Sequence, residues 1–480
     1  MVDTRFETFE VLPRDHESLP ETTEYELSDI DQVLTGNHTT PCIVYPFTGD
    51  KDDFIKPLRT GLQNVLTCIP LVGGELLTKD GRLWVLRKNH EPIRLGVNHL
   101  DEDPDFPTYE SLSAAKFPAE FFSANALRLT PPGSNLAGLR RDDGCPVAVF
   151  QANFIKGGLI LTLPLHHCCG DAKSIDHTFL LWVNSTLAAA NKAPMPTFHP
   201  SIDRTYFNAT ASLPSQEKLE DMKSKISGFS FHPIQPEPPS KPLNDPPKPP
   251  VASIKMYHFP KTSIEELKRI CWPATGTGID FVSSYDVVCA LTWQAMTRAR
   301  IPYLKPDLQT VTTEFGHPVN ARACFNSVVP AEYFGNGFSM VATAPILISE
   351  LIGTGGLAKA AQLIRRSVHS FDVDYIPNFL QVGHAVAGKE QIQWNWRPQN
   401  VVGTSWMSMG AMQAYDFGLG LPTAIRLPVP PFEGVLGVLP ATRTDGVPEG
   451  FDVYVVLEAG CQERLTVDSD FGKYCSLIGA

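Results

Sequence analysis

The segment AVFQANFIKGGLILTLPLHHCCGDAKS, residues 148–174, decides the fold because apolar runs, a turn and a helix start follow one another in it. The two apolar runs, Ala148–Phe154 and Leu159–Leu165, flank the pair Gly157-Gly158. Runs of this length on either side of paired glycines predict two strands joined by a turn. Gln151 and Asn153 interrupt the first strand, whereas the second strand is almost wholly apolar and is expected to be buried.

A helix is expected directly after this strand pair. Ile175, Phe179 and Trp182 recur at helical spacing, so the helix begins just after Asp171. The second strand therefore runs straight into His166-His167. Histidine is the usual general base near neutral pH, and a base at the end of a rigid strand is held more firmly than one on a loop. The pattern makes His167 a candidate base.

Other roles for these residues remain open. Asp171 could orient His167 or anchor its loop, and it could equally cap the following helix. Four consecutive side chains, His166 to Cys169, cannot all converge on one tetrahedral centre, so we expect no zinc site and no other metal. A histidine whose hydrogen bonds are satisfied inside the core is the default alternative.

Outward from this segment, helices and strands alternate in both halves of the chain. A helix with apolar positions at 55, 58, 62 and 65 is expected to stop after Cys68, because Pro70 follows. In the second half, Ser283 or Ser284 could cap a helix, a second helix carries apolar residues from Leu357 to Val368, and residues 453–457 read as a late strand. This order predicts an α/β protein with two layered domains.

A proline-rich run separates the two halves. Nine of the eighteen residues from Pro233 to Pro250 are proline, which excludes a helix or a central strand there. We interpret residues 231–250 as a semi-rigid crossover linker between an N-terminal domain, 1–230, and a C-terminal domain, 251–480. A ligand for an SH3 or WW domain is the alternative. No repeat relates the halves.

Composition narrows the class of protein. The 480 residues carry 40 basic and 52 acidic side chains, a net charge of −12, with 43% hydrophobic residues. This balance offers no basic face for nucleic acid and is typical of a globular protein. The N-terminus lacks the pattern of a signal peptide, no run is long enough to span a membrane, and the ten cysteines include no CxxC pair. We therefore expect a cytoplasmic protein.

Several catalytic motifs are missing from the sequence. It contains neither the GxSxG turn of α/β-hydrolases nor a Walker loop. Residues 353–358 fit the loose GxGxxA form of a dinucleotide fingerprint, with an acidic residue, Asp372 or Asp374, about twenty positions further on. The strand before it would have to contain Glu350 close to the turn, so a glycine-rich helix start is the better interpretation.

The chain resembles the BAHD acyl-CoA-dependent acyltransferases, and among them the fungal trichothecene O-acetyltransferase type. The resemblance runs from end to end. The segments that carry it are LSDID (27–31), CIPLVGGEL (68–76), the HxxxD region (150–171), SSYDVVCALTWQAMTRAR (283–300), VNAR (319–322), YFGN (333–336), TSW (404–406) and YDFGLG (415–420). HxxxD alone is weak, but the set at these distances is specific.

The resemblance implies two chloramphenicol acetyltransferase-like domains, each a mixed sheet with flanking helices, around a channel. It makes His167 the general base in mid-channel, with acyl-CoA entering from one face and the acceptor from the other. It also implies that Asp171 points away from the reacting atoms and pairs with Arg322. A buried carboxylate needs such a partner, and an arginine fork would hold the histidine loop across the domain interface.

Further roles follow from the same resemblance. Thr404 and Trp406 are expected beside the reacting centre, where a hydroxyl and an indole N–H could stabilise an oxyanion; core packing is the alternative for the tryptophan. The DFGxG motif is expected to be structural and consists here of Asp416, Phe417, Gly418 and Gly420. Two residues depart from the family pattern, Ala172 for glycine and Leu419 for tryptophan, and neither removes a reacting group.

The phosphates of coenzyme A need local cations in this acidic chain. Lys261, Thr262 and Ser263 open a helix after the strand Ile254–Phe259, so free N–H groups and a lysine could meet there. A solvated helix start explains the same residues equally well. Acyl-CoA, most simply acetyl-CoA, is expected as a co-substrate, and no permanently bound cofactor is implied.

The sequence therefore predicts an acyltransferase that moves an acyl group, in the simplest case acetyl, to a hydroxyl of a hydrophobic, terpenoid-like secondary metabolite. No covalent acyl-enzyme is needed, and family members are commonly monomers. Two alternatives stay open. The same base could run a cyclisation or elimination without coenzyme A, or the chain could be a non-catalytic homologue that binds a ligand. Acceptor and acyl length depend on the shape of the channel.

Overall fold

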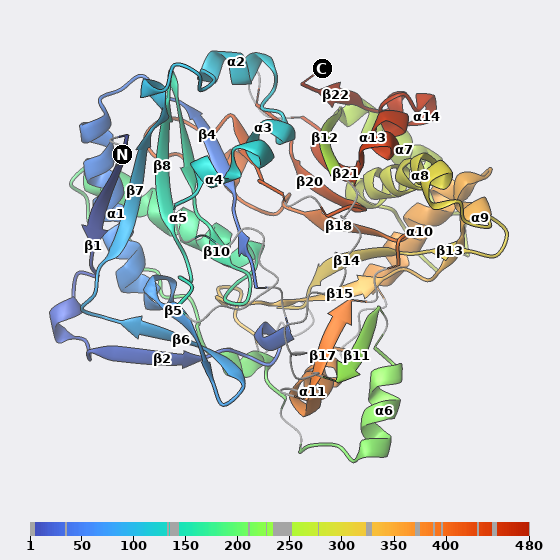
Figure 1. Ribbon diagram of the computed structural model, residues 1–480, viewed down its shortest axis with the longest axis horizontal. Helices are drawn as coiled ribbons and strands as arrows, with labels where there is room; N and C mark the ends of the chain where they lie inside the picture. The colour runs from blue at the N-terminus through green and yellow to red at the C-terminus, as the bar shows by residue number, and fades with distance from the viewer. Residues whose placement is uncertain are drawn as a thin grey trace, which may run out of the picture.

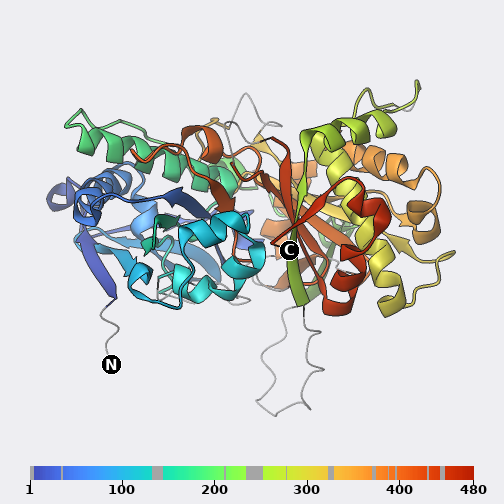
Figure 2. The same ribbon diagram turned by 90° about the horizontal axis from the view of Figure 1, so that it is seen from above.

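The computed structural model describes residues 5–33, 36–131, 134, 144–209, 212–226, 228–233, 252–276, 278–322, 329–369, 375–386, 389–394, 397–429, 432–443 and 449–479. Two lobes lie side by side, one built mainly from the first half of the chain and the other mainly from the second (Figure 1, Figure 2). Each lobe has a sheet with helices packed on it.

The first lobe is built on a six-stranded sheet in the order β1-β7-β8-β9-β4-β19 and a three-stranded sheet in the order β2-β6-β5. Its strands are β1 (Phe6–Val11), β2 (Thr22–Glu26), β3 (His38–Thr39), β4 (Cys42–Pro46), β5 (Glu75–Lys79), β6 (Arg82–Lys88), β7 (Ile93–His99), β8 (Phe150–Ile155), β9 (Gly158–Thr162) and β10 (Leu165–His166). Its helices are α1 (Lys51–Cys68), α2 (Tyr109–Ala114), α3 (Ala119–Ala124), α4 (Ala126–Leu129) and α5 (Ala172–Ala190). α6 (Gln216–Ser224) follows in the first half of the chain but packs against α11 (Tyr375–Val386) of the second lobe (Figure 1).

The predicted strand pair is β8 and β9. The two strands pair antiparallel, and every residue in them is buried. Gly157 takes a φ of 78° in the turn between them, a conformation that glycine adopts without strain. α1 ends at Cys68, as the proline at position 70 predicted, and it packs against α5. These local predictions are confirmed.

The second lobe is built on a seven-stranded sheet in the order β15-β14-β18-β20-β21-β12-β22. Its strands, with those of two smaller pairings, are β11 (Phe229–Pro233), β12 (Ala252–Phe259), β13 (Thr312–Thr313), β14 (Phe315–Asn320), β15 (Phe338–Ala342), β16 (Ile346–Leu347), β17 (Glu390–Trp394), β18 (Val401–Ser405), β20 (Val435–Pro440), β21 (Phe451–Glu458) and β22 (Ser476–Ile478). β19 (Ala424–Arg426), also from the second half of the chain, belongs to the sheet of the first lobe. The helices are α7 (Lys261–Cys271), α8 (Ser284–Leu304), α9 (Ile348–Ile352), α10 (Gly356–His369), α11 (Tyr375–Val386), α12 (Ala411–Ala414), α13 (Ala459–Thr466) and α14 (Ser469–Gly472).

Helix starts in this lobe follow from local side chains. Ser283, the first of the two candidate caps, accepts a hydrogen bond from the backbone of Asp286, whose own carboxylate accepts from the backbone of Ser283. This reciprocal pair satisfies two N–H groups that the first turn of α8 would otherwise leave without partners. α10 and β21 cover the second predicted helix and the late strand.

The second half of the chain contributes a strand to the sheet of the first lobe. β19, from the second half of the sequence, pairs antiparallel with β4 and forms the edge of the first sheet. Trp406, Tyr415 and Phe417 belong to the same buried core as the first-half residues around them. The predicted C-terminal domain, 251–480, therefore includes a strand that belongs to the sheet of the first lobe. A strand of three residues is too short for its sequence to indicate which strand it pairs with.

The first three residues of the predicted linker belong to a strand. Residues 231–233 end β11, which pairs antiparallel with β17. The rest of the proline-rich run, residues 234–250, lies outside the described residues. The dinucleotide fingerprint has the wrong setting, because the helix α9, and not a strand, precedes Gly353. Among the described residues no group of three or more metal-ligating side chains occurs, and no helix combines the length and apolarity needed to cross a bilayer.

Candidate active site

The two adjacent histidines face different surroundings. Both lie where β10 leads into the turn before α5, and β10 pairs with β3. The ring of His166 is buried and packs edge-on against His38, with 5.2 Å between ring centroids. The ring of His167 lies 5.7 Å from that of Phe338, the first residue of β15 in the second lobe. Of the two imidazoles, that of His167 therefore lies at the junction of the lobes.

Burial sets the protonation state of His167. Desolvation lowers the pKa of His167 below its usual 6.5, and its own backbone carbonyl, Asp171, Asn336 and Asp31 oppose this only in part. The imidazole is therefore neutral at pH 7, and a neutral ring has the free lone pair that a base requires.

Asp171 caps α5 and binds the second lobe at the same time. Its Oδ1 accepts from the backbone N–H groups of Lys173 and Ser174, each at 3.1 Å. Arg322, just beyond β14, donates from Nη1 to Oδ2 at 2.7 Å and from Nη2 to Oδ1 at 3.1 Å. The backbone N–H of Gly337 donates to Oδ2 at 3.0 Å. Both alternatives left open for Asp171, a helix cap and an anchor, thus describe the same carboxylate.

The charge of Asp171 is stabilised where it lies. Although burial alone would raise it, the pKa of Asp171 is held below its usual value by the guanidinium of Arg322 and by backbone donors. A carboxylate that already accepts this many hydrogen bonds has no free lone pair to offer a reacting proton. Its effect on the site is to fix the turn that carries His167.

Two glycines let the arginines approach. A Cβ on Gly337 would lie 2.6 Å from Cζ of Arg322, and one on Gly335 would overlap Nη1 of Arg204. Ser174 Oγ also donates to the carbonyl of Gly335 at 3.0 Å and accepts from its N–H at 2.9 Å. The backbone at 335–337 therefore packs directly against side chains of both halves, Arg322 from the second half and Arg204 and Ser174 from the first.

Three residues to which the sequence analysis assigned no role contact the turn that carries His167. Asp31 of the LSDID segment, Asn336 of YFGN, and Arg204 are all buried. Asn336 Nδ2 donates to Asp31 Oδ1 at 2.7 Å and to the carbonyl of His167 at 2.8 Å. Arg204 donates to Asp31 Oδ2 at 3.2 Å and to the carbonyl of Cys169 at 2.9 Å. Asp31 and Asn336 fall in motifs that carry the family resemblance, and this is the signal in the sequence that could have identified them. Nothing in the sequence distinguishes Arg204.

Thr404 and Trp406 lie at the end of β18 in the second lobe. Trp406 is 5% exposed, and its backbone N–H donates to the carbonyl of Val438. Its side chain packs in the core shared by the two lobes. In the described part of the chain neither residue makes a hydrogen bond or a ring contact with His167. Their role at the reacting centre stays a prediction.

The DFGLG motif forms a tight turn that docks one lobe on the other. Asp416 Oδ1 accepts from the backbone N–H groups of Gly418 at 2.8 Å and Gly420 at 2.9 Å, and both glycines have positive φ, 89° and 81°. The ring of Phe417 packs edge-on against Trp182 of α5, with 5.5 Å between centroids. Leu419, in place of tryptophan, packs against the same core.

Lys261 opens α7 on the molecular surface. The helix has no side-chain cap, because Pro260 precedes it. Lys261 is mostly exposed and, among the described residues, pairs with the carboxylate of Glu449, with 3.9 Å between Nζ and Oε1. Thr262 and Ser263 follow it in the first turn. The geometry leaves the phosphate-binding prediction for these three residues open.

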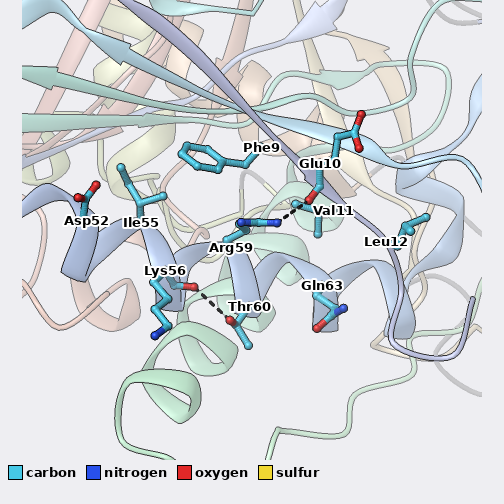
Figure 3. A pocket seen from close by; sticks show the side chains of 10 residues that line it. All are labelled: Phe9, Glu10, Val11, Leu12, Asp52, Ile55, Lys56, Arg59, Thr60 and Gln63. Carbon is cyan, nitrogen blue, oxygen red and sulfur yellow. Dashed lines mark hydrogen bonds between the residues drawn. The ribbon is translucent and has the colours of Figure 1, made fainter.

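A pocket of about 430 Å³ lies elsewhere, between the edge strand β1 and helix α1 (Figure 3). Arg59 crosses it, donating to the carbonyl of Glu10 at 3.2 Å with its guanidinium over the ring of Phe9. None of the predicted site residues lines this pocket. It is therefore not the candidate active site.

Comparison with known proteins identifies the family to which this chain belongs. A model described as the Transferase family matches residues 10–465. The chain belongs to this family. Trichothecene 3-O-acetyltransferase TRI101 of Fusarium sporotrichioides is 27% identical over 485 residues, which cover 95% of this chain and 97% of that protein. Its crystal structure, complexed with coenzyme A and T-2, superposes with a TM-score of 0.76 at 25% identity, covering 95% of this chain and all of that one.

A second solved structure confirms the fold. Vinorine synthase superposes with a TM-score of 0.67 at 16% identity and covers 98% of both chains. The predicted architecture of two chloramphenicol acetyltransferase-like domains and the resemblance to the BAHD enzymes are thus confirmed. The family and the match to TRI101 identify the protein as an acyl-CoA-dependent O-acyltransferase.

Proposed function

We propose that this protein transfers an acetyl group from acetyl-CoA to a hydroxyl of a hydrophobic secondary metabolite, with His167 as the general base. The observation that carries the proposal is the state of His167: an imidazole at the junction of the lobes, neutral because its pKa is lowered, on a turn fixed by Asp171 and Arg322. TRI101 supports the acceptor class, because its structure holds coenzyme A and T-2.

In the proposed reaction His167 takes the proton of the acceptor hydroxyl while the oxygen attacks the thioester carbonyl. The tetrahedral oxyanion then collapses, the carbon–sulfur bond breaks, and the protonated imidazole returns its proton to the departing thiolate. The products are the ester and free coenzyme A, so atoms and charge balance. One imidazole serves both steps because no acyl-enzyme forms.

Two further groups belong to the proposal. The hydroxyl of Thr404 and the indole N–H of Trp406, both at the end of β18, would donate to the oxyanion, where preorganised donors have most effect. Lys261, with the free N–H groups of Thr262 and Ser263, would bind phosphates of the donor. The enzyme would act as a cytoplasmic monomer, in keeping with cysteines that are buried wherever the structure describes them.

The test is mass spectrometry of metabolites after incubation with acetyl-CoA and a panel of hydroxylated terpenoids. We expect a mass gain of one acetyl group on an acceptor, with release of free thiol. His167→Ala should reduce kcat about 10²–10⁴-fold, whereas His199→Ala, which changes an exposed histidine, should not alter it. Turnover that persists without acyl-CoA would favour the cyclisation or elimination, and ligand binding without turnover would favour the non-catalytic homologue.

A further inference from the structure

The turn from His167 to Asp171 is held by two separate clusters, each centred on a carboxylate. Arg322 and the chain at 335–337 hold the side chain of Asp171. The second cluster, Asp31, Arg204 and Asn336, holds the backbone of the same turn at two carbonyls. Only the first of these clusters has a role in the proposed mechanism.

We propose that Asp31, Arg204 and Asn336 are positioning residues that fix the carbonyls of His167 and Cys169 and thereby set the direction of the His167 imidazole. The inference rests on the proposed role of His167 as base. None of the three touches the reacting atoms in this assignment; they act through the backbone that carries the ring.

Asp31 is the centre of the cluster. It is fully buried, and its Oδ2 also accepts from the backbone N–H and the hydroxyl of Ser28, at 2.9 and 2.7 Å. Its Oδ1 accepts only the amide of Asn336 among the described contacts. Because an amide group is planar and rigid, the 2.7 Å bond to Asp31 fixes where the second hydrogen of Asn336 Nδ2 points. That hydrogen points at the carbonyl oxygen of His167, which lies 2.8 Å from Nδ2.

Arg204 fixes the other end of the turn. One nitrogen pairs with Asp31 and another donates to the carbonyl of Cys169, two residues beyond His167. With both carbonyls held, the peptide planes that join His167 to Cys168 and Cys169 to Gly170 cannot rotate freely, and the Cα–Cβ bond of His167 has one direction. The ring then needs only the contact with Phe338 to restrict its remaining rotation.

Electrostatics gives the cluster a second, measurable effect. Asn336 and Asp31 each raise the pKa of His167, as Asp171 does, against the larger effect of burial. The positive charges nearby, Arg204 and Arg322, are each paired with one of these carboxylates. A cluster that acted only on global stability would leave the titration of His167 unchanged.

The experiment compares Asn336→Leu with Tyr45→Phe. Leucine has the same branching and the same number of heavy side-chain atoms as asparagine but is bulkier, so it removes both donated bonds and leaves little room for a replacing water. Tyr45→Phe is the matched control, because it removes a buried bond of 2.7 Å between the halves, from Tyr45 to the carbonyl of Tyr415, away from the turn. We expect kcat of Asn336→Leu to fall on the order of 10- to 100-fold, with KM for acyl-CoA unchanged and Tyr45→Phe at the parent kcat.

NMR titration of His167 in labelled protein gives a readout that needs no substrate. Asn336→Leu should move the midpoint to lower pH, and Tyr45→Phe should not. If Asn336→Leu fails to fold, the double variant Asp31→Asn with Arg204→Gln replaces it, since it leaves no uncompensated buried charge; the same shift and the same loss of kcat are expected. A folded variant with the parent kcat or the parent titration midpoint would overturn the inference.

The two proposals fail differently. If the parent transfers no acyl group, the proposed function fails, and the titration of His167 still tests whether Asp31, Arg204 and Asn336 control the ring. If the parent is active and the variants keep its kcat, only the positioning role is lost.

Discussion

Replacing Asp171 with asparagine tests whether its carboxylate has a structural role or takes part in the reaction. The carboxylate accepts from both terminal nitrogens of Arg322 and from three backbone N–H groups, those of Lys173, Ser174 and Gly337. An amide has only one acceptor oxygen. Either orientation of the new amide turns its NH₂ toward at least two donors, so Asp171→Asn creates repulsion as well as removing charge.

The expected cost follows from the burial of the partner. Arg322 is 6% exposed, so the variant leaves an uncompensated charge inside the protein. Breaking a buried ion pair in this way costs about 3–5 kcal/mol, out of a total stability of about 5–15 kcal/mol for a typical protein. The ratio of unfolded to folded protein should rise by about 10²- to 4,000-fold. We expect low yield of folded enzyme rather than a folded, inactive one.

The assay is urea unfolding followed by tryptophan fluorescence, with kcat measured on the folded fraction. Asp221→Asn is the control, because that residue forms an exposed pair with Lys225 and should cost no more than about 1 kcal/mol. Replacing both partners, Asp171→Leu with Arg322→Met, should recover part of the stability, since no charge then stays buried. If Asp171→Asn unfolds at the parent midpoint and yet has lost turnover, Asp171 has a direct part in proton transfer and the reasoning is refuted.

The same pair predicts the response to acid. The pKa of Asp171 is lower in the folded protein than its usual value of 3.8 because of Arg322 and the backbone donors. Its contribution to stability is therefore complete above the unfolded pKa and is lost as pH falls through the lower, folded value. The stability difference between the parent and Asp171→Asn should accordingly be largest near neutral pH and shrink below about pH 4.

Three further outcomes are expected. The acid limb of kcat/KM should have its midpoint below pH 6.5, because burial lowers the pKa of His167 and the base must be deprotonated; a midpoint above 6.5 would contradict this. Gly337→Ala should lower stability by about 1–3 kcal/mol in thermal unfolding, because its Cβ would press on Arg322, whereas Gly472→Ala, with nothing within 4 Å, should not. Lys261→Ala should raise KM for acyl-CoA and leave KM for the acceptor unchanged. If the variant and the parent have the same KM for acyl-CoA, Lys261 does not bind the donor.

Sequence patterns predicted what local physics determines. The turn at Gly157-Gly158, the end of α1 at Cys68 and the capped start at Ser283 each depend on neighbours a few residues away. The pairing of Asp171 with Arg322 spans 151 residues and was expected only from the family resemblance. A single sequence contains no spacing rule for so distant a partner.

What sequence reasoning missed is also long-range. Arg204 and Asp31 are 173 residues apart, and a lone arginine in an aperiodic stretch gives no sign that it will be buried. β19 is three residues long and joins the sheet of the other half, so no alternation marks its face or partner. Nothing in the sequence distinguishes Gly335 and Gly337 from other loop glycines; the need for glycine comes from the two guanidinium groups that lie beside them in the fold.

The candidate base, His167, lies in the first half of the chain, but residues of the second half hold its turn in place through hydrogen bonds. His167 follows a first-half strand, but the carbonyl of His167 is bound by Asn336 and the carboxylate of its turn by Arg322, both from the second half. The second half in turn completes the first sheet through β19. If His167 is the base, a correctly held imidazole exists only when the halves are docked. Changes that loosen this interface should therefore reduce kcat before they unfold either lobe.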